Sequence, residues 1–117
     1  MIALDTNILA RLLLADDAGQ HARAVAMLKD DRTYTAPVTV ILELAGILIT
    51  AGKERTEIAA ALRDLIAVPA FKPKEPEALL RALHWYESGL DFADALHLAL
   101  SAGEDSLATF DEPKNRS

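Results

Sequence analysis

Ile2-Ala3-Leu4-Asp5-Thr6-Asn7-Ile8-Leu9 is the stretch that decides the fold class, because a strand pattern passes directly into a helix pattern within it. Ile2 to Leu4 is a short apolar run typical of a buried strand, and Asp5, Thr6 and Asn7 are residue types that cap helices. A helical apolar pattern then follows from Ile8 to Leu13. The stretch predicts a strand, then a helix, with Asp5 at the junction.

The same alternation continues along the chain. Further strands are expected at Tyr34–Ala36, Ala67–Phe71 and Ser106–Phe110, and further helices around 22–28, 37–50, 54–66, 77–88 and 91–102. Strands that alternate with helices predict an α/β fold, a short parallel sheet that helices flank on both faces. The 117 residues and 51% apolar content suit one domain, 1–117, with one core. Functional groups in such sheets gather at the carboxyl ends of the strands.

Composition restricts the possible functions. No apolar run reaches the ~18 residues that a membrane helix needs, and with neither a secretory leader pattern nor a cysteine the chain is expected in the cytoplasm, away from membranes. The net charge of −6 argues against a broad basic surface that would hold nucleic acid. Any chemistry on nucleic acid would therefore have to recruit a cation.

Glu43 is the only charged residue between Pro37 and Lys53. The helix around it is apolar on nearly every side, so we expect that helix to be buried together with Glu43. A buried carboxylate must be neutralised, paired with a basic side chain or bound to a metal. The sequence leaves a structural salt bridge and a metal site both open for Glu43.

A polar stripe runs along the helix expected at 91–102, where Asp91, Asp94, His97 and Ser101 recur at three- or four-residue steps. Asp91 precedes the helix, and capping is its expected role. Asp94 lies about one turn further in and is the expected functional member. A single His among oxygen ligands is more often a hydrogen-bonding neighbour than a ligand, so His97 is given that role.

Asp5 and Asp111 both follow a strand pattern. Each has a structural alternative, since Asp5 could serve as a helix cap and Asp111 as a turn residue before Pro113. If Asp5, Glu43, Asp94 and Asp111 converge, a cation must offset their repulsion, and all-oxygen ligands suit Mg²⁺ or Mn²⁺. Such a site commonly supports phosphodiester hydrolysis.

Four motifs occur in order over nearly the whole chain: Asp5-Thr6-Asn7, Glu43-Leu44, Asp91-Phe92-Ala93-Asp94-Ala95-Leu96-His97-Leu98-Ala99, and Thr109-Phe110-Asp111. This combination resembles the PIN-domain nucleases and, within them, the VapC-type toxins of toxin-antitoxin systems. The resemblance implies a Rossmann-like sheet and an endoribonuclease that depends on Mg²⁺ or Mn²⁺. It also implies a homodimer that a cognate antitoxin inhibits by placing its tail in the acidic cleft.

The resemblance assigns roles to individual residues. It places the catalytic metal site on Asp5, Glu43, Asp94 and Asp111, and supporting roles on Thr6, Asn7 and Thr109, with Asp91 beside them as a cap. In this interpretation Asp5, Glu43 and Asp94 bind the first metal, and Asp111 helps a second metal or orients water. Thr6 and Asn7 are expected to hold the Asp5 carboxylate, although helix capping accounts for Asn7 equally well.

Two other functions stay open, and one of them follows from a departure from the family pattern. Family members usually carry an aromatic residue near the third position after the Thr-x-Asp element and then a final strand, whereas this chain has Lys114 there and ends at Ser117. A PIN-like binding module without catalysis is therefore one alternative. A receiver-type phosphoacceptor domain is a weaker one, because the strand patterns near Tyr34 and Val68 end without the Asp that such a domain needs.

Overall fold

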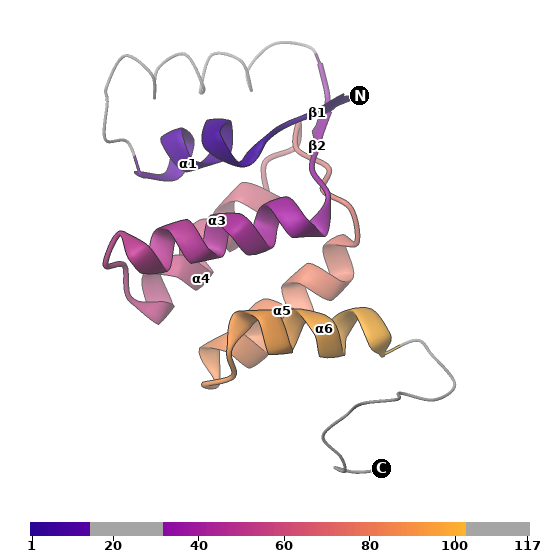
Figure 1. The fold of residues 1–117 in the computed structure, drawn as a ribbon. Helices are drawn as coiled ribbons and strands as arrows, with labels where there is room; N and C mark the ends of the chain where they lie inside the picture. The colour runs from indigo at the N-terminus through magenta and orange to yellow at the C-terminus, as the bar shows by residue number, and fades with distance from the viewer. Residues whose placement is uncertain (15–31, 103–117) are drawn as a thin grey trace.

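The structure is a computed structural model that describes residues 1–14 and 32–102. Within these ranges the elements in chain order are β1 (Ile2–Ala3), α1 (Thr6–Leu14), β2 (Tyr34–Thr35), α3 (Val38–Thr50), α4 (Arg55–Ile66), α5 (Pro76–Glu87) and α6 (Phe92–Ser101). Figure 1 shows the two strands side by side at one end of α3. The helices expected from the sequence at 37–50, 54–66, 77–88 and 91–102 are confirmed, with ends that differ by one residue.

The strands pair in parallel. Ile2 lies opposite Tyr34 and Ala3 opposite Thr35, and the Leu4 amide donates to the Thr35 carbonyl at 2.8 Å. On the other side of β2, Tyr34 forms a parallel bridge with Phe71, which the Lys72 amide extends by donating to the Tyr34 carbonyl at 2.7 Å. The parallel sheet predicted from the sequence is confirmed.

Two strand expectations need correction. Ile2 and Ala3 are exposed rather than buried, because β1 pairs on one side only in the described part of the chain, and Leu4 is the residue of that run that enters the core. The segment expected as a strand at Ala67–Phe71 turns at Pro69 and Ala70 and pairs only at its last residue. Proline has no amide hydrogen to give to a ladder, which explains the late start. The strand expected at Ser106–Phe110 lies outside the described residues.

α3 is the central helix. It contacts α1, α4 and α6, and α5 packs against both α4 and α6 (Figure 1). Its buried residues are Ile41, Leu44, Ala45 and Leu48, at the spacing of one helix face. Of the helices that the structure describes, none is long and apolar enough to cross a membrane.

Candidate active site

Asp5 stands at the carboxyl end of β1, where the chain enters α1. Its Oδ1 accepts a hydrogen bond from the Ile8 amide at 3.0 Å, so it satisfies one of the amide groups that a helix leaves unpaired at its start. The capping role that the sequence allowed for Asp5 is confirmed. Asp5 is exposed and keeps Oδ2 outside this bond, which is compatible with a second role. Asn7 lies inside α1 and is not its cap.

A short hydrogen bond joins α1 to α3. The Thr6 hydroxyl donates to Glu43 Oε1 at 2.6 Å, across 37 positions of sequence. The expectation that Thr6 holds the Asp5 carboxylate is therefore wrong, since its hydroxyl goes to Glu43. The bond brings the first residue of α1 and the acidic residue of α3 to one place, beside Asp5.

Glu43 is exposed, and the expectation that it is buried is wrong. α3 turns one face into the core, while Thr39, Glu43, Gly46 and Thr50, spaced three or four residues apart, share an exposed face. The apolar sequence suggested complete burial, but Ile49 is 51% exposed as well. Glu43 consequently does not carry the cost of an isolated buried charge, and that argument for a metal does not apply.

An open groove lies along this exposed face. Its volume is about 710 Å³, and it is lined by Thr6, Asn7, Glu43, Gly46, Ile47, Thr50 and Ala51. Gly46 and Thr50 were not singled out from the sequence, although both lie on the face of α3 that carries Glu43. The helical spacing from Glu43 would have identified them. A Cβ atom added at Gly46 would meet nothing within 4 Å, so the groove is open beside this residue.

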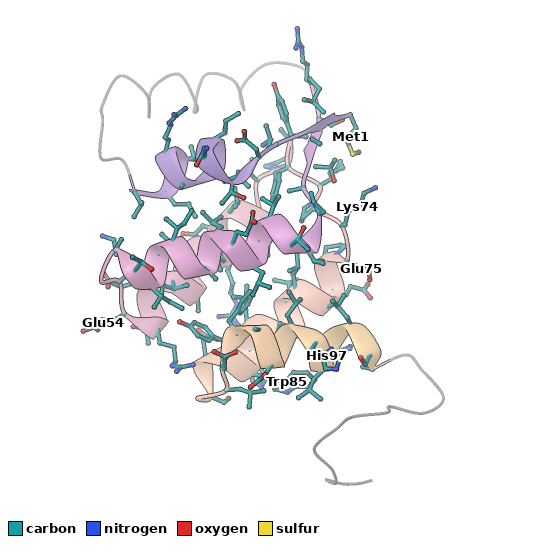
Figure 2. All side chains as sticks on the ribbon, in the orientation of Figure 1. Met1, Glu54, Lys74, Glu75, Trp85 and His97 are labelled. Atoms are coloured by element: carbon teal, nitrogen blue, oxygen red, sulfur yellow. The ribbon has the colours of Figure 1, made fainter. Side chains whose placement is uncertain are left out.

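Asp91 and Asp94 stand at the start of α6. Asp91 Oδ2 accepts a hydrogen bond from the Asp94 amide at 3.2 Å, which confirms Asp91 as the cap. Asp94 is the third residue of α6, and its carboxylate is exposed. His97, one turn further along, is also exposed (Figure 2). The polar stripe predicted for this helix therefore faces outward, while Phe92, Ala95, Leu96 and Ala99 are buried.

The three described acids come from two neighbouring helices and the strand end beside them. α3, which carries Glu43, contacts both α1 and α6. Their exposed carboxylates are hard oxygen donors of the type that Mg²⁺ and Mn²⁺ accept, so the residues fit a metal by chemistry. Within residues 1–14 and 32–102, however, no three acidic, His or Cys side chains form a group that could hold a metal ion. Asp111 and Thr109 lie outside the described residues.

A known protein family and a solved structure are similar to this chain. A crystal structure of VapC20 from Mycobacterium tuberculosis, a sarcin-ricin loop cleaving toxin, is similar to this chain. It has 23% sequence identity and a TM-score of 0.47, over 87% of this chain and 82% of that one. No curated protein sequence matches at a significant level. The family described as the PIN domain matches residues 2–113, nearly the full length, and this chain therefore belongs to the PIN domain family.

Proposed function

We propose that this protein is an endoribonuclease that depends on Mg²⁺ or Mn²⁺, and that it is the toxin of a toxin-antitoxin pair. Its membership of the PIN family over residues 2–113 supports a nuclease. The observation in the structure that carries the proposal is the 2.6 Å hydrogen bond from Thr6 to Glu43 at the edge of an open groove. It joins two of the motifs that are far apart in sequence at one accessible surface.

The proposed metal ligands are Asp5, Glu43, Asp94 and Asp111. A bound divalent cation would offset the repulsion of these carboxylates, lower the pKa of a bound water and hold the scissile phosphate. The Thr6 hydroxyl holds Glu43 by Oε1 and so fixes the direction in which Oε2 points. Asp5 is held in the same way, since its Oδ1 is fixed by the Ile8 amide.

The net charge of the protein also supports a site that depends on a bound cation. With a net charge of −6, the protein has no general attraction for a polyanion, so attraction for RNA must come from the site itself. A cation among the acids would reverse the sign of the local field there. We therefore place the RNA backbone in the groove beside Glu43, with Asn7 and Thr50 as polar groups on its walls.

The groove also suggests how protein partners act on this chain. We propose a cytoplasmic homodimer that a cognate antitoxin inhibits by inserting its tail into the groove. The groove's apolar lining from Ile47 and Ala51, next to the Glu43 carboxylate, suits a peptide with both apolar and basic side chains. Light scattering of the purified protein tests the dimer, and loss of cleavage on adding the antitoxin tests the inhibition.

Glu43→Gln tests the proposal directly. Glutamine keeps an oxygen that can accept from Thr6 but removes the charge that a hard cation needs, so metal-stimulated RNA cleavage should fall by at least about tenfold. Glu77→Gln is the matched control, because Glu77 is an exposed acid on α5 that does not line the groove. Equal activity of the two variants would contradict the assignment of Glu43.

A binding module without catalysis is the second candidate function. It is favoured by one feature of the sequence: Lys114 stands where the PIN-domain nucleases that this chain resembles usually carry an aromatic residue. RNA cleavage measured with chelator and with Mn²⁺ separates the two. Stimulation by Mn²⁺ supports the nuclease, and RNA binding without cleavage in either condition supports the binding module.

A further inference from the structure

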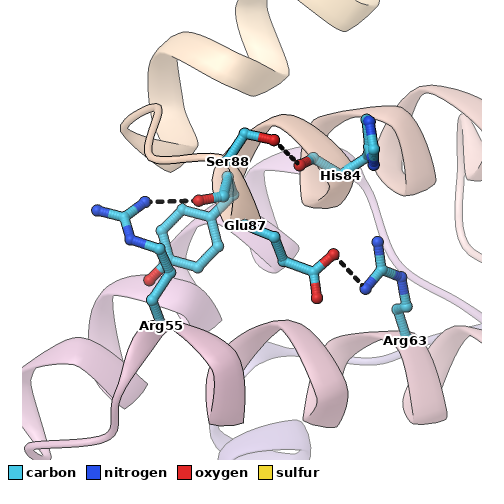
Figure 3. A network of polar contacts seen from close by, with 6 residues as sticks. Arg55, Arg63, His84, Glu87 and Ser88 are labelled. Atoms are coloured by element: carbon cyan, nitrogen blue, oxygen red, sulfur yellow. Dashed lines mark hydrogen bonds and ion pairs between the residues drawn. The ribbon is translucent and has the colours of Figure 1, made fainter.

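Arg55, the first residue of α4, makes three contacts with the end of α5 and the turn that follows it. Its Nη1 donates to the Tyr86 carbonyl at 2.7 Å and to the Leu90 carbonyl at 2.8 Å. Its guanidinium carbon lies 4.4 Å from the centroid of the Tyr86 ring, within cation-π distance. Figure 3 shows Arg55 reaching from α4 to this corner. A positive charge is favourable there, because the carbonyls at the end of a helix carry partial negative charge.

The turn that Arg55 contacts is short and has a defined backbone. Gly89, two residues after the end of α5, has a φ of 117°. Its amide donates to the Tyr86 carbonyl at 3.0 Å, and the Leu90 amide donates to the Trp85 carbonyl at 3.1 Å. This pair of bonds is the Schellman arrangement that closes many helices. Asp91 follows at once as the cap of α6. The Leu90 carbonyl is thus held by Arg55 immediately before the residue that starts the helix carrying Asp94.

A contact between two aromatic rings also links Arg55 to the start of α6. Tyr86, under the guanidinium, packs edge to face against Phe92, with centroids 5.7 Å apart and planes at 82°. Phe92 is the first residue of α6 and is buried. Arg55 therefore acts on both sides of Asp91, through the Leu90 carbonyl before it and through the Tyr86 and Phe92 rings after it.

We propose that Arg55 is a positioning residue for the active site, one that sets where α6 begins and therefore where Asp94 lies. This inference rests on the proposed function, in which Asp94 is a ligand. Arg55 itself is not among the residues that line the groove. A lysine could not do the same, because only the planar guanidinium presents several donors in a fixed fork while it stacks on a ring.

Arg63 supplies a matched control. It lies on the same helix and pairs with Glu87 of α5 at 2.5 Å, so it links α4 to α5 without touching the turn (Figure 3). Its side chain is 36% exposed. Arg63→Met therefore removes the same charge from the same helix and weakens the same helix pair, and it leaves the α5–α6 turn as it is.

The test compares Arg55→Met, Arg55→Lys and Arg63→Met by amide hydrogen exchange and by steady-state RNA cleavage with Mn²⁺. In Arg55→Met the amides of residues 89–94 should exchange at least about tenfold faster, while those of α3 stay within about twofold of wild type. Its kcat should fall by about tenfold with KM changed less than about twofold, since the substrate groove is intact. Arg55→Lys should lie between Arg55→Met and wild type, and Arg63→Met should match wild type in both measurements.

Three results would overturn the proposal. In the first, residues 89–94 exchange at the wild-type rate in Arg55→Met. In the second, Arg63→Met accelerates them equally. In the third, exchange rises throughout the protein in Arg55→Lys as well as in Arg55→Met, which would make the role one of general stability. If wild type does not cleave RNA at all, the proposed function fails, whereas the exchange result still decides whether Arg55 holds the start of α6.

Discussion

Thr6→Val isolates the contact that joins α1 to α3. Valine keeps the branched shape of threonine and has nearly the same helix propensity, so the change removes the hydroxyl and little else. What is lost is the 2.6 Å bond from Thr6 Oγ1 to Glu43 Oε1. The substitution therefore tests both the stability that this bond supplies and the orientation that it gives the carboxylate.

The exposure of Thr6 and Glu43 determines how much stability and activity Thr6→Val should lose. A hydrogen bond to a charged group contributes about 1.5 to 3 kcal/mol when shielded from water. Thr6 is half-buried and Glu43 is exposed, so water competes for both partners and the contribution falls to about 1 kcal/mol. For a domain of this size that corresponds to a Tm lower by about 4 °C. If Glu43 also loses its orientation in the transition state, about 1 kcal/mol lowers the cleavage rate by roughly fivefold.

Thermal unfolding and RNA cleavage in Mn²⁺ measure the two effects. Thr6→Ser is the rescue variant, because serine retains the hydroxyl and should recover most of both. Thr56→Val makes the same chemical change at an exposed position of α4 and should leave cleavage unchanged. If Thr6→Ser loses as much activity as Thr6→Val, or if Thr6→Val cleaves RNA at the wild-type rate, the hydroxyl does not orient Glu43 and this reasoning is refuted.

Further substitutions test the α6 acids and two glycines. Asp94→Asn should abolish RNA cleavage without unfolding the protein. Asp91→Asn should lower cleavage only modestly, because Asn caps a helix about as well as Asp. Asp64→Asn, on the exposed side of α4, is the control for the loss of one charge. Equal loss in Asp91→Asn and Asp94→Asn would show that Asp91 is more than a cap. Gly89→Ala should lower the free energy of unfolding by about 1 kcal/mol or more, since Gly89 has a φ of 117° that alanine rarely adopts. Gly46→Ala lies within a helix and places nothing within 4 Å of the new Cβ, so it should raise the free energy of unfolding by roughly 0.5 to 1 kcal/mol. Denaturant unfolding measures both variants, and a more stable Gly89→Ala or a less stable Gly46→Ala would contradict these predictions.

The helices could be predicted from the sequence because their apolar residues recur at helical spacing and proline or glycine residues stand near several of their ends. In the structure Pro37 lies directly before α3, and Gly52 and Gly89, both with positive φ, lie just after α3 and α5. The parallel pairing of β1 with β2 could be predicted for a related reason, since a helix follows each strand pattern. Local sequence is sufficient where local geometry decides the structure.

The environment of Glu43 could not be predicted in this way. Apolar residues on several sides of α3 suggested burial, but which side is covered depends on where α1, α4 and α6 pack, and these contacts are long-range. The partner of Thr6 was missed for the same reason, because 37 positions separate it from Glu43. Asp5 shows the opposite case. Its capping bond joins Asp5 to the amide of Ile8, only three residues along the chain, so it could be predicted from the sequence.

The proposal that Asp5, Glu43, Asp94 and Asp111 hold a divalent cation is the central claim. The measurement that tests it most directly is a crystal of the protein soaked in Mn²⁺, with anomalous diffraction recorded to locate the ion. We predict anomalous density at the carboxylates of the four proposed ligands, and its loss from crystals of Asp94→Asn. Density at another place, or none at these carboxylates when Mn²⁺ is in large excess, would contradict it.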